Sequence, residues 1–224
     1  MQLSAPAKIN LSFLIKGRRD DGFHEIETLM APISLADRIT IEKRDSDGEI
    51  RFSCDDPRLP CDDDNLVVRA AKLFRERCGI KTGITIHLEK RIPHGAGLGG
   101  GSSDAASTLL GLDEMFDTRL GRQELLGLAA RLGSDVPFFV VQSAALCRGR
   151  GEIVTPVSLE AKFPLLLLKP EFGVPTPWAY ARWNDSVEIP GVDYSAQEYG
   201  RVRFANNLER PVFEKFVLLA YLKT

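Results

Sequence analysis

The residues best suited to chemistry in this sequence form a glycine-rich loop that two hydroxyl side chains follow. Gly95-Ala96-Gly97-Leu98-Gly99-Gly100-Gly101 is followed directly by Ser102, Ser103 and Asp104, and then by an apolar helical pattern. Glycines let successive backbone N–H groups turn inward as an anion-binding nest, and the start of a helix adds unpaired donors and the positive end of its dipole. The segment therefore predicts a phosphate site.

The residues after the glycines separate this loop from two other phosphate-binding loops. A Walker-type loop requires a lysine after its last glycine, and this chain has none there, so that class of ATPase is excluded. Gly95, Gly97 and Gly100 match the dinucleotide pattern G-x-G-x-x-G. That fold also needs a buried strand and an acid after the helix, whereas residues 113–117 lead into another helix, so the pattern argues against a dinucleotide site.

The elements that must position this loop belong to an α+β chain. Alternating apolar residues predict strands at 11–15, 24–30, 38–42 and 84–88, and a turn at 45–48. Helical spacing predicts a helix over 66–77, with Asn65 as its N-cap and Gly79 after its end. It predicts further helices over 102–112, 125–132 and 211–220. Residues 143–154 and 163–169 are predicted as strands, and 170–177 as a proline-rich crossing.

Composition excludes several classes of protein. The chain has 224 residues, of which 44% are hydrophobic and 27% charged, and its net charge is −2, so it is neither disordered nor basic enough to be drawn to nucleic acid or anionic lipid. No apolar run approaches a membrane span, and the first residues do not form a signal peptide, so we expect a cytoplasmic protein. The four cysteines form no C-x-x-C pair and are expected to be free thiols. No dedicated protein metal site is expected, since the acids at 55–56 and 62–64 are typical of solvated loops.

Three segments resemble one family of kinases. Residues 93–106, which contain the glycine loop, resemble the ATP-phosphate loop of the GHMP kinases. The opening Ala-Pro-Ala-Lys-Ile-Asn-Leu at 5–11, with residues 18–29, and Gly-Ser-Asp-Val-Pro-Phe-Phe at 133–139 are similar to the branch that acts on a cytidyl-linked methylerythritol. The resemblance runs from about Ser4 to the C-terminus. It implies ATP-dependent phosphorylation of the 2-hydroxyl of that small molecule, in non-mevalonate isoprenoid synthesis, with Mg²⁺ bound together with ATP.

The resemblance also implies a fold and a set of site residues. The fold is the two-domain GHMP kinase fold, with a ribosomal protein S5 domain 2-like ATP-binding domain at 1–155 and an incomplete ferredoxin-like domain at 156–224. Lys8 and Asp135 are the implied catalytic pair. The implied ATP-binding residues are Asn65, Pro93, His94, Gly95, Ala96, Gly97, Leu98, Gly99, Gly100, Gly101, Ser102 and Ser103, and the implied substrate-binding residues are Asn10, Phe23, His24, Thr176 and Tyr180.

The proposed roles agree with the chemistry of the side chains. A carboxylate can accept the proton of an attacking hydroxyl, while a nearby ammonium keeps that carboxylate ionised. An aromatic pair and a hydrogen-bonding side chain suit a nucleobase, although the family usually has Tyr where this chain has Phe23. Ser102 and Ser103 can meet the phosphates or the Mg²⁺.

The end of the chain departs from the family pattern. Members of the family continue into a third glycine-rich motif, so we expect a C-terminal truncation and a partly open apolar stripe along the 211–220 helix. A different GHMP kinase and a non-catalytic nucleotide-binding fragment remain alternatives, and the sequence does not indicate the oligomeric state.

Overall fold

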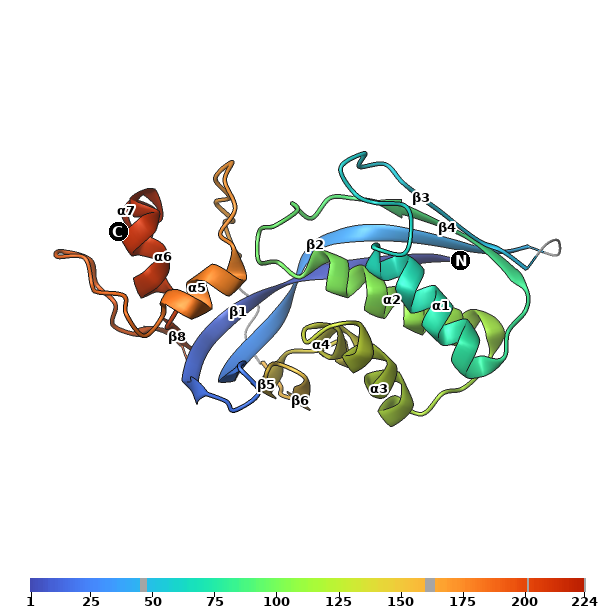
Figure 1. The fold of residues 1–224 in the computed structure, drawn as a ribbon, viewed down its shortest axis with the longest axis horizontal. Coiled ribbons are helices and arrows are strands. Elements are labelled where there is room, and N and C mark those ends of the chain that lie inside the picture. The colour runs from blue at the N-terminus through green and yellow to red at the C-terminus, as the bar shows by residue number, and fades with distance from the viewer. Residues whose placement is uncertain (45–47, 160–163, 201, 224) are drawn as a thin grey trace.

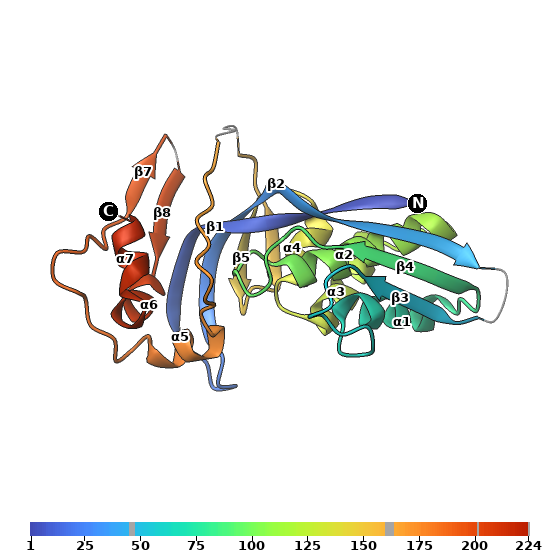
Figure 2. The same ribbon diagram turned by 90° about the horizontal axis from the view of Figure 1, so that it is seen from above.

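The computed structural model describes residues 1–44, 48–159, 164–200 and 202–223. Its organising feature is an antiparallel hairpin of two long strands, β1 (Gln2–Arg18) and β2 (His24–Arg44), which runs through both ends of the molecule (Figures 1 and 2). The register of β1 against β2 shifts between Pro6 and Lys8, between Asn10 and Ser12, and again near Gly17. Such bulges bend a strand and increase its twist, which lets one hairpin serve two ends of the molecule.

Further strands extend this hairpin into an open sheet with the order β3-β4-β2-β1-β8-β7. β4 (Gly83–Glu89) pairs antiparallel with the C-terminal half of β2, and β3 (Ile50–Cys54) pairs parallel with β4. β5 (Ala145–Gly149) pairs with β2 over residues 26–30, and β6 (Ile153–Pro156) pairs with β5. β8 (Val202–Asn206) lies parallel to β1, and β7 (Gln197–Tyr199) borders β8.

Four helices cover one face of the N-terminal part of the sheet: α1 (Leu66–Cys78), α2 (Gly100–Phe116), α3 (Arg122–Leu132) and α4 (Val136–Val141) (Figure 1). α1 begins where Asn65 Oδ1 accepts the Val67 N–H at 2.9 Å, and it ends at Gly79 in the left-handed conformation. The main core lies between these helices and the strands, and its largest fully buried side chains include Phe74, Phe138, Ile39, Ile86 and Leu109.

The C-terminal elements gather around the other end of the hairpin (Figure 2). They are α5 (Thr176–Arg182), α6 (Glu209–Lys215) and α7 (Val217–Lys223), together with β7 and β8. A smaller cluster of Leu11, Ala31, Ala144 and Val202 joins them to the hairpin. Because β8 pairs with β1, the last part of the chain shares a sheet with the first.

Most expected elements are confirmed, and three expectations are corrected. The strand expected at 163–169 is wrong: residues 164–169 have no regular structure, Leu166 and Leu168 are exposed, and Phe163 lies outside the described residues. The helix expected over 211–220 is broken at Phe216, where the backbone leaves helical geometry, and Val217, Leu218, Tyr221 and Leu222 are exposed. The proline-rich crossing is shorter than expected, because α5 already begins at Thr176. The turn expected at 45–48 lies outside the described residues, apart from Gly48.

Candidate active site

The glycine-rich loop connects β4 to α2 and has the backbone of an anion-binding nest. Gly95, Gly97 and Gly99 take φ values of +67°, +72° and +71°, and Gly99 is the N-cap of α2. This left-handed region is one that glycine enters without a steric penalty. The Lys8 N–H donates to Leu98 O at 2.9 Å, so the loop is tied to the first strand.

A cavity of about 380 Å³ opens over this loop and the start of α1. Apart from Ser103, all the residues implied to bind ATP line it: Asn65, Pro93, His94, Gly95, Ala96, Gly97, Leu98, Gly99, Gly100, Gly101 and Ser102. Ser103 is fully buried on the inner side of α2, and its hydroxyl has no hydrogen-bond partner among the described residues. Asn65 uses its side chain structurally, since its amide also donates to Pro60 O at 2.9 Å.

A buried ion cluster lies beneath the loop. The Lys90 ammonium pairs with Asp37 and, at 2.8 Å, with Asp104 in the first turns of α2. Asp37 also accepts the backbone N–H groups of Arg91 and Ile92, which fixes the chain that leads into the loop. Burial raises the pKa of Asp104 to about 7, against the opposing effect of Lys90. Sequence reasoning missed this cluster because its members are far apart in the chain.

Lys8 lies under the loop on β1 and is only 6% exposed. Its Nζ donates to Asn10 Oδ1 at 2.6 Å, and a Cβ added to Gly99 would lie 3.1 Å from its Cγ. Burial lowers the pKa of the Lys8 ammonium, while the charge of Asp135 opposes that effect. Lys8 therefore lies against the loop and interacts electrostatically with Asp135.

Asp135 stands immediately before α4, and its side chain makes no capping hydrogen bond to that helix. Its negative charge adds to the effect of burial in raising the pKa values of Cys147 and Tyr180 to about 12. Both neighbours are therefore neutral at physiological pH. Because no capping bond occupies its oxygens, the Asp135 carboxylate is available for proton transfer.

A second cavity, of about 680 Å³, contains Asp135 and most of the residues implied to bind substrate. Phe23, His24, Thr176 and Tyr180 line it, whereas Asn10 does not. Ser102 lines both cavities, so the phosphate loop and the second cavity meet at this residue.

The aromatic side chains of the second cavity are already partly engaged with one another. The His24 ring stacks on Tyr180, with centroids 5.1 Å apart and an interplanar angle of 25°. Phe23 is 52% exposed, and the Arg150 guanidinium lies 4.7 Å above its ring. Arg18 and Arg150 also line the cavity, and sequence reasoning missed both. No sequence pattern distinguishes Arg18 and Arg150 from the arginines that are common in surface loops.

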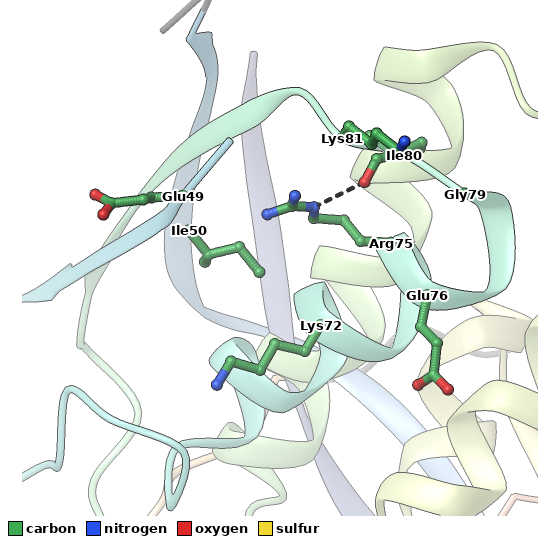
Figure 3. A pocket seen from close by; sticks show the side chains of 8 residues that line it. All are labelled: Glu49, Ile50, Lys72, Arg75, Glu76, Gly79, Ile80 and Lys81. Carbon is green, nitrogen blue, oxygen red and sulfur yellow. Dashed lines mark hydrogen bonds between the residues drawn. The ribbon is translucent and has the colours of Figure 1, made fainter. Parts of the chain in front are cut away.

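A separate surface hollow of about 750 Å³ lies beside the C-terminal half of α1, where Lys72, Arg75 and Glu76 line it together with Ile50 (Figure 3). Arg75 donates there to Ile80 O at 3.1 Å, and Lys72 pairs with Asp63. Its wall carries charges of both signs: Lys72, Arg75 and Glu76 belong to α1, while Glu49 precedes β3 and Lys81 follows α1.

The described part of the chain contains no set of three or more His, Cys, Asp or Glu side chains placed to hold a metal ion. In the same residues, no helix combines the length and the apolar character that crossing a membrane requires. All four cysteines are free thiols, as the sequence predicts.

Comparisons with known proteins agree with this geometry. The GHMP kinases N terminal domain family matches residues 65–143. A 4-diphosphocytidyl-2-C-methyl-D-erythritol kinase from Methylacidiphilum infernorum is 46% identical over 223 residues, which cover 98% of this chain and 76% of that protein. The corresponding kinase from Alkaliphilus metalliredigens is 46% identical over 180 residues, or 80% of this chain and 62% of that one.

Among solved structures, this chain is similar to a kinase of the same name. A crystal structure of 4-(cytidine 5'-diphospho)-2C-methyl-D-erythritol kinase has a TM-score of 0.79 and 38% identity, with 99% of this chain and 81% of that chain covered. Mevalonate pyrophosphate decarboxylase from Streptococcus pyogenes, at 13% identity and a TM-score of 0.60, is similar in fold alone.

Proposed function

Since this chain belongs to the 4-diphosphocytidyl-2-C-methyl-D-erythritol kinases of the GHMP family, we propose that it transfers a phosphoryl group from ATP to the 2-hydroxyl of 4-diphosphocytidyl-2-C-methyl-D-erythritol. The observation that carries the proposal is the meeting of the two cavities at Ser102. Phosphoryl transfer depends mainly on placing donor and acceptor in line, and a phosphate loop adjoining a nucleotide-sized cavity supplies that placement.

ATP would bind with its phosphates on the glycine loop. The left-handed glycines and the start of α2 offer backbone donors for the phosphate oxygens. Mg²⁺ fits this site as an ion held chiefly by phosphates, because Ser102, which carries a hydroxyl, lines the cavity, while the described residues include no group of three or more His, Cys, Asp or Glu that could hold a metal ion. Bound there with ATP, it would neutralise phosphate charge.

Asp135 would accept the proton of the attacking hydroxyl. It lines the acceptor cavity and makes no capping bond that would compete for its oxygens. Lys8 would keep that carboxylate ionised and offset the charge that develops during transfer. Burial lowers the pKa of Lys8, and the hydrogen bond to Asn10 and the charge of Asp135 favour its ammonium form.

The acceptor would be recognised by its base and by its diphosphate. His24, stacked on Tyr180, supplies a hydrogen-bonding edge for cytosine, and Phe23 offers an exposed ring face. Arg18 and Arg150 line the same cavity and supply positive charge for the diphosphate. The substrate contact implied for Asn10 stays a prediction; its side chain is hydrogen-bonded to Lys8 and Thr28.

An assay of ADP release tests the proposal. Wild-type protein should release ADP with the cytidyl acceptor, and Asp135→Asn should lower turnover by about a hundredfold or more while calorimetry finds the same ATP affinity. Turnover with homoserine or mevalonate instead of the cytidyl acceptor would favour a different GHMP kinase. ATP binding without ADP release from any acceptor would favour a non-catalytic nucleotide-binding protein.

A further inference from the structure

A chain of three hydrogen bonds leads from Lys8 away from both cavities. Lys8 Nζ donates to Asn10 Oδ1 at 2.6 Å, and Asn10 Nδ2 donates to Thr28 Oγ1 at 2.7 Å. Thr28 Oγ1 in turn donates to Ser12 O at 2.6 Å. The chain runs across the β1–β2 hairpin, and Thr28 at its far end is 0% exposed and lines neither cavity.

The chemistry of these groups fixes the direction of the whole chain. A carbonyl oxygen can only accept, so the single Thr28 proton must go to Ser12 O. Thr28 then has only lone pairs to offer Asn10, which must turn its NH₂ group toward Thr28. The Asn10 amide oxygen is therefore the atom that faces Lys8, an orientation that the hydrogen-bond network assigns.

This orientation favours a charged Lys8. An acceptor beside the ammonium stabilises its charged form, whereas a flipped Asn10 amide would place an NH₂ donor against it. The ionisable groups facing Lys8 from the elements packed around it are Asp135 before α4 and the Cys147 thiol on β5. Burial lowers the pKa of Lys8, whereas the charge of Asp135 raises it, as the Asn10 oxygen does by accepting from the ammonium.

We propose that Thr28 is a positioning residue that fixes the Asn10 amide and through it holds Lys8 as a correctly directed ammonium. The proposal rests on the function proposed above for Lys8. Thr28 touches neither ATP nor the acceptor, so its loss should lower kcat and leave both KM values unchanged.

Replacement of the Thr28 hydroxyl tests the proposal. Thr28→Val keeps the shape of the side chain but removes both hydrogen bonds, and Thr28→Ser restores the hydroxyl. We expect Thr28→Val to lower kcat by about ten- to a hundredfold, because a released Asn10 amide would no longer hold its hydrogen bond to the Lys8 ammonium, and Thr28→Ser to recover most of it. Thr40→Val, the same change farther along β2, is the matched control and should behave as wild type.

The pH dependence separates positioning from general packing. Without the fixed Asn10 oxygen, the Lys8 ammonium loses a stabilising partner, so the basic limb of the kcat profile should move to lower pH in Thr28→Val and return in Thr28→Ser. Lysine ¹³Cε titration by NMR, with the Lys8 signal identified by Lys8→Arg, should show the same downward movement of the Lys8 pKa without any turnover.

The outcomes distinguish this inference from the proposed function. An unchanged kcat and an unchanged Lys8 titration in Thr28→Val would overturn the role of Thr28 even if Asp135→Asn is inactive. Equal losses of kcat in Thr28→Val and Thr28→Ser would assign Thr28 to packing and would also overturn its positioning role. If Thr28→Val does not fold, Thr28→Ala replaces it under the same criteria. If Thr28→Ala also fails to fold while Thr28→Ser folds with a wild-type Lys8 titration, the Thr28 hydroxyl is structural and the inference fails. A wild-type protein without turnover would refute the proposed function, while the Lys8 titration would still decide the role of Thr28.

Discussion

Alanine at Gly99 should destabilise the protein far more than alanine at Gly97, although the two glycines have almost the same backbone conformation. Their φ values are +71° and +72°. A Cβ at Gly99 would lie 2.8 Å from Phe139 Cζ and 3.1 Å from Lys8 Cγ, whereas a Cβ at Gly97 would meet nothing within 4 Å. The pair therefore separates backbone strain from steric overlap.

The magnitudes can be worked out from these contacts. A left-handed conformation costs an alanine about 1–2 kcal/mol, and the loss of unfolded-state freedom returns about 0.4–1 kcal/mol, so Gly97→Ala should lower the free energy of unfolding by about 1 kcal/mol. Overpacking typically adds about 1–3 kcal/mol, so Gly99→Ala should lower it by about 2–4 kcal/mol. In a chain of this size these values correspond to falls in Tm of about 2–4 °C and about 5–15 °C.

Thermal melts of both variants at equal concentration measure the difference. Gly101→Ala is the second control, because Gly101 lies in α2, its φ is not positive, and an added Cβ would make ordinary contact with Leu66 Cδ1 at 3.7 Å. It should melt at or slightly above the wild-type temperature, since alanine favours a helix. Equal Tm values for Gly99→Ala and Gly97→Ala would show that Phe139 and Lys8 do not pack against the loop as described.

Three further predictions concern charge and recognition. Arg150→Met should raise KM for the cytidyl acceptor by about tenfold and leave KM for ATP unchanged, as initial-rate kinetics would measure; an equal rise in both would exclude a diphosphate contact. Burial raises the pKa of Asp104 to about 7, so the stability that its protonated carboxyl contributes is full below about pH 4 and declines as the pH rises through 7. In melts from pH 5 to 8, the Tm of Asp104→Asn should therefore rise relative to that of wild type. A constant difference in Tm would contradict the raised pKa. His24→Ala should reduce discrimination between cytidyl and uridyl acceptors more than it reduces ATP use, whereas equal loss of both acceptors would assign the ring to packing against Tyr180.

Elements with strong local signals were predictable from the sequence. Asn65 and Gly79 mark the ends of α1 because capping depends on a few neighbouring residues. The apolar run at 164–168 has the composition of a strand, yet no strand among the described residues pairs with it, and it stays irregular and exposed. Phe216 fits a helical stripe, but the backbone breaks there and separates α6 from α7. Strand pairing and helix continuity depend on tertiary partners that a local pattern does not contain.

The candidate site was predictable to a similar degree. The glycine loop, Lys8 and Asp135 each belong to a short motif, and the structure brings them together. Arg18 and Arg150 carry no motif, and they line one cavity only because β1 and the turn after β5 lie at the same edge of the site. The division of the chain at residue 155 stays a prediction.

The sequence by itself determined the parts whose structure is local: a glycine-rich loop, the start of the helix after it, and an acid placed before α4. Only the tertiary structure decided what those parts face. Asn10 accepts a hydrogen bond from Lys8, and Ser103 is fully buried on α2, while their predicted contacts with substrate and phosphates stay predictions. The reason is physical: the side to which a residue turns depends on strand register and helix packing, which bulges in β1 and contacts between distant segments set.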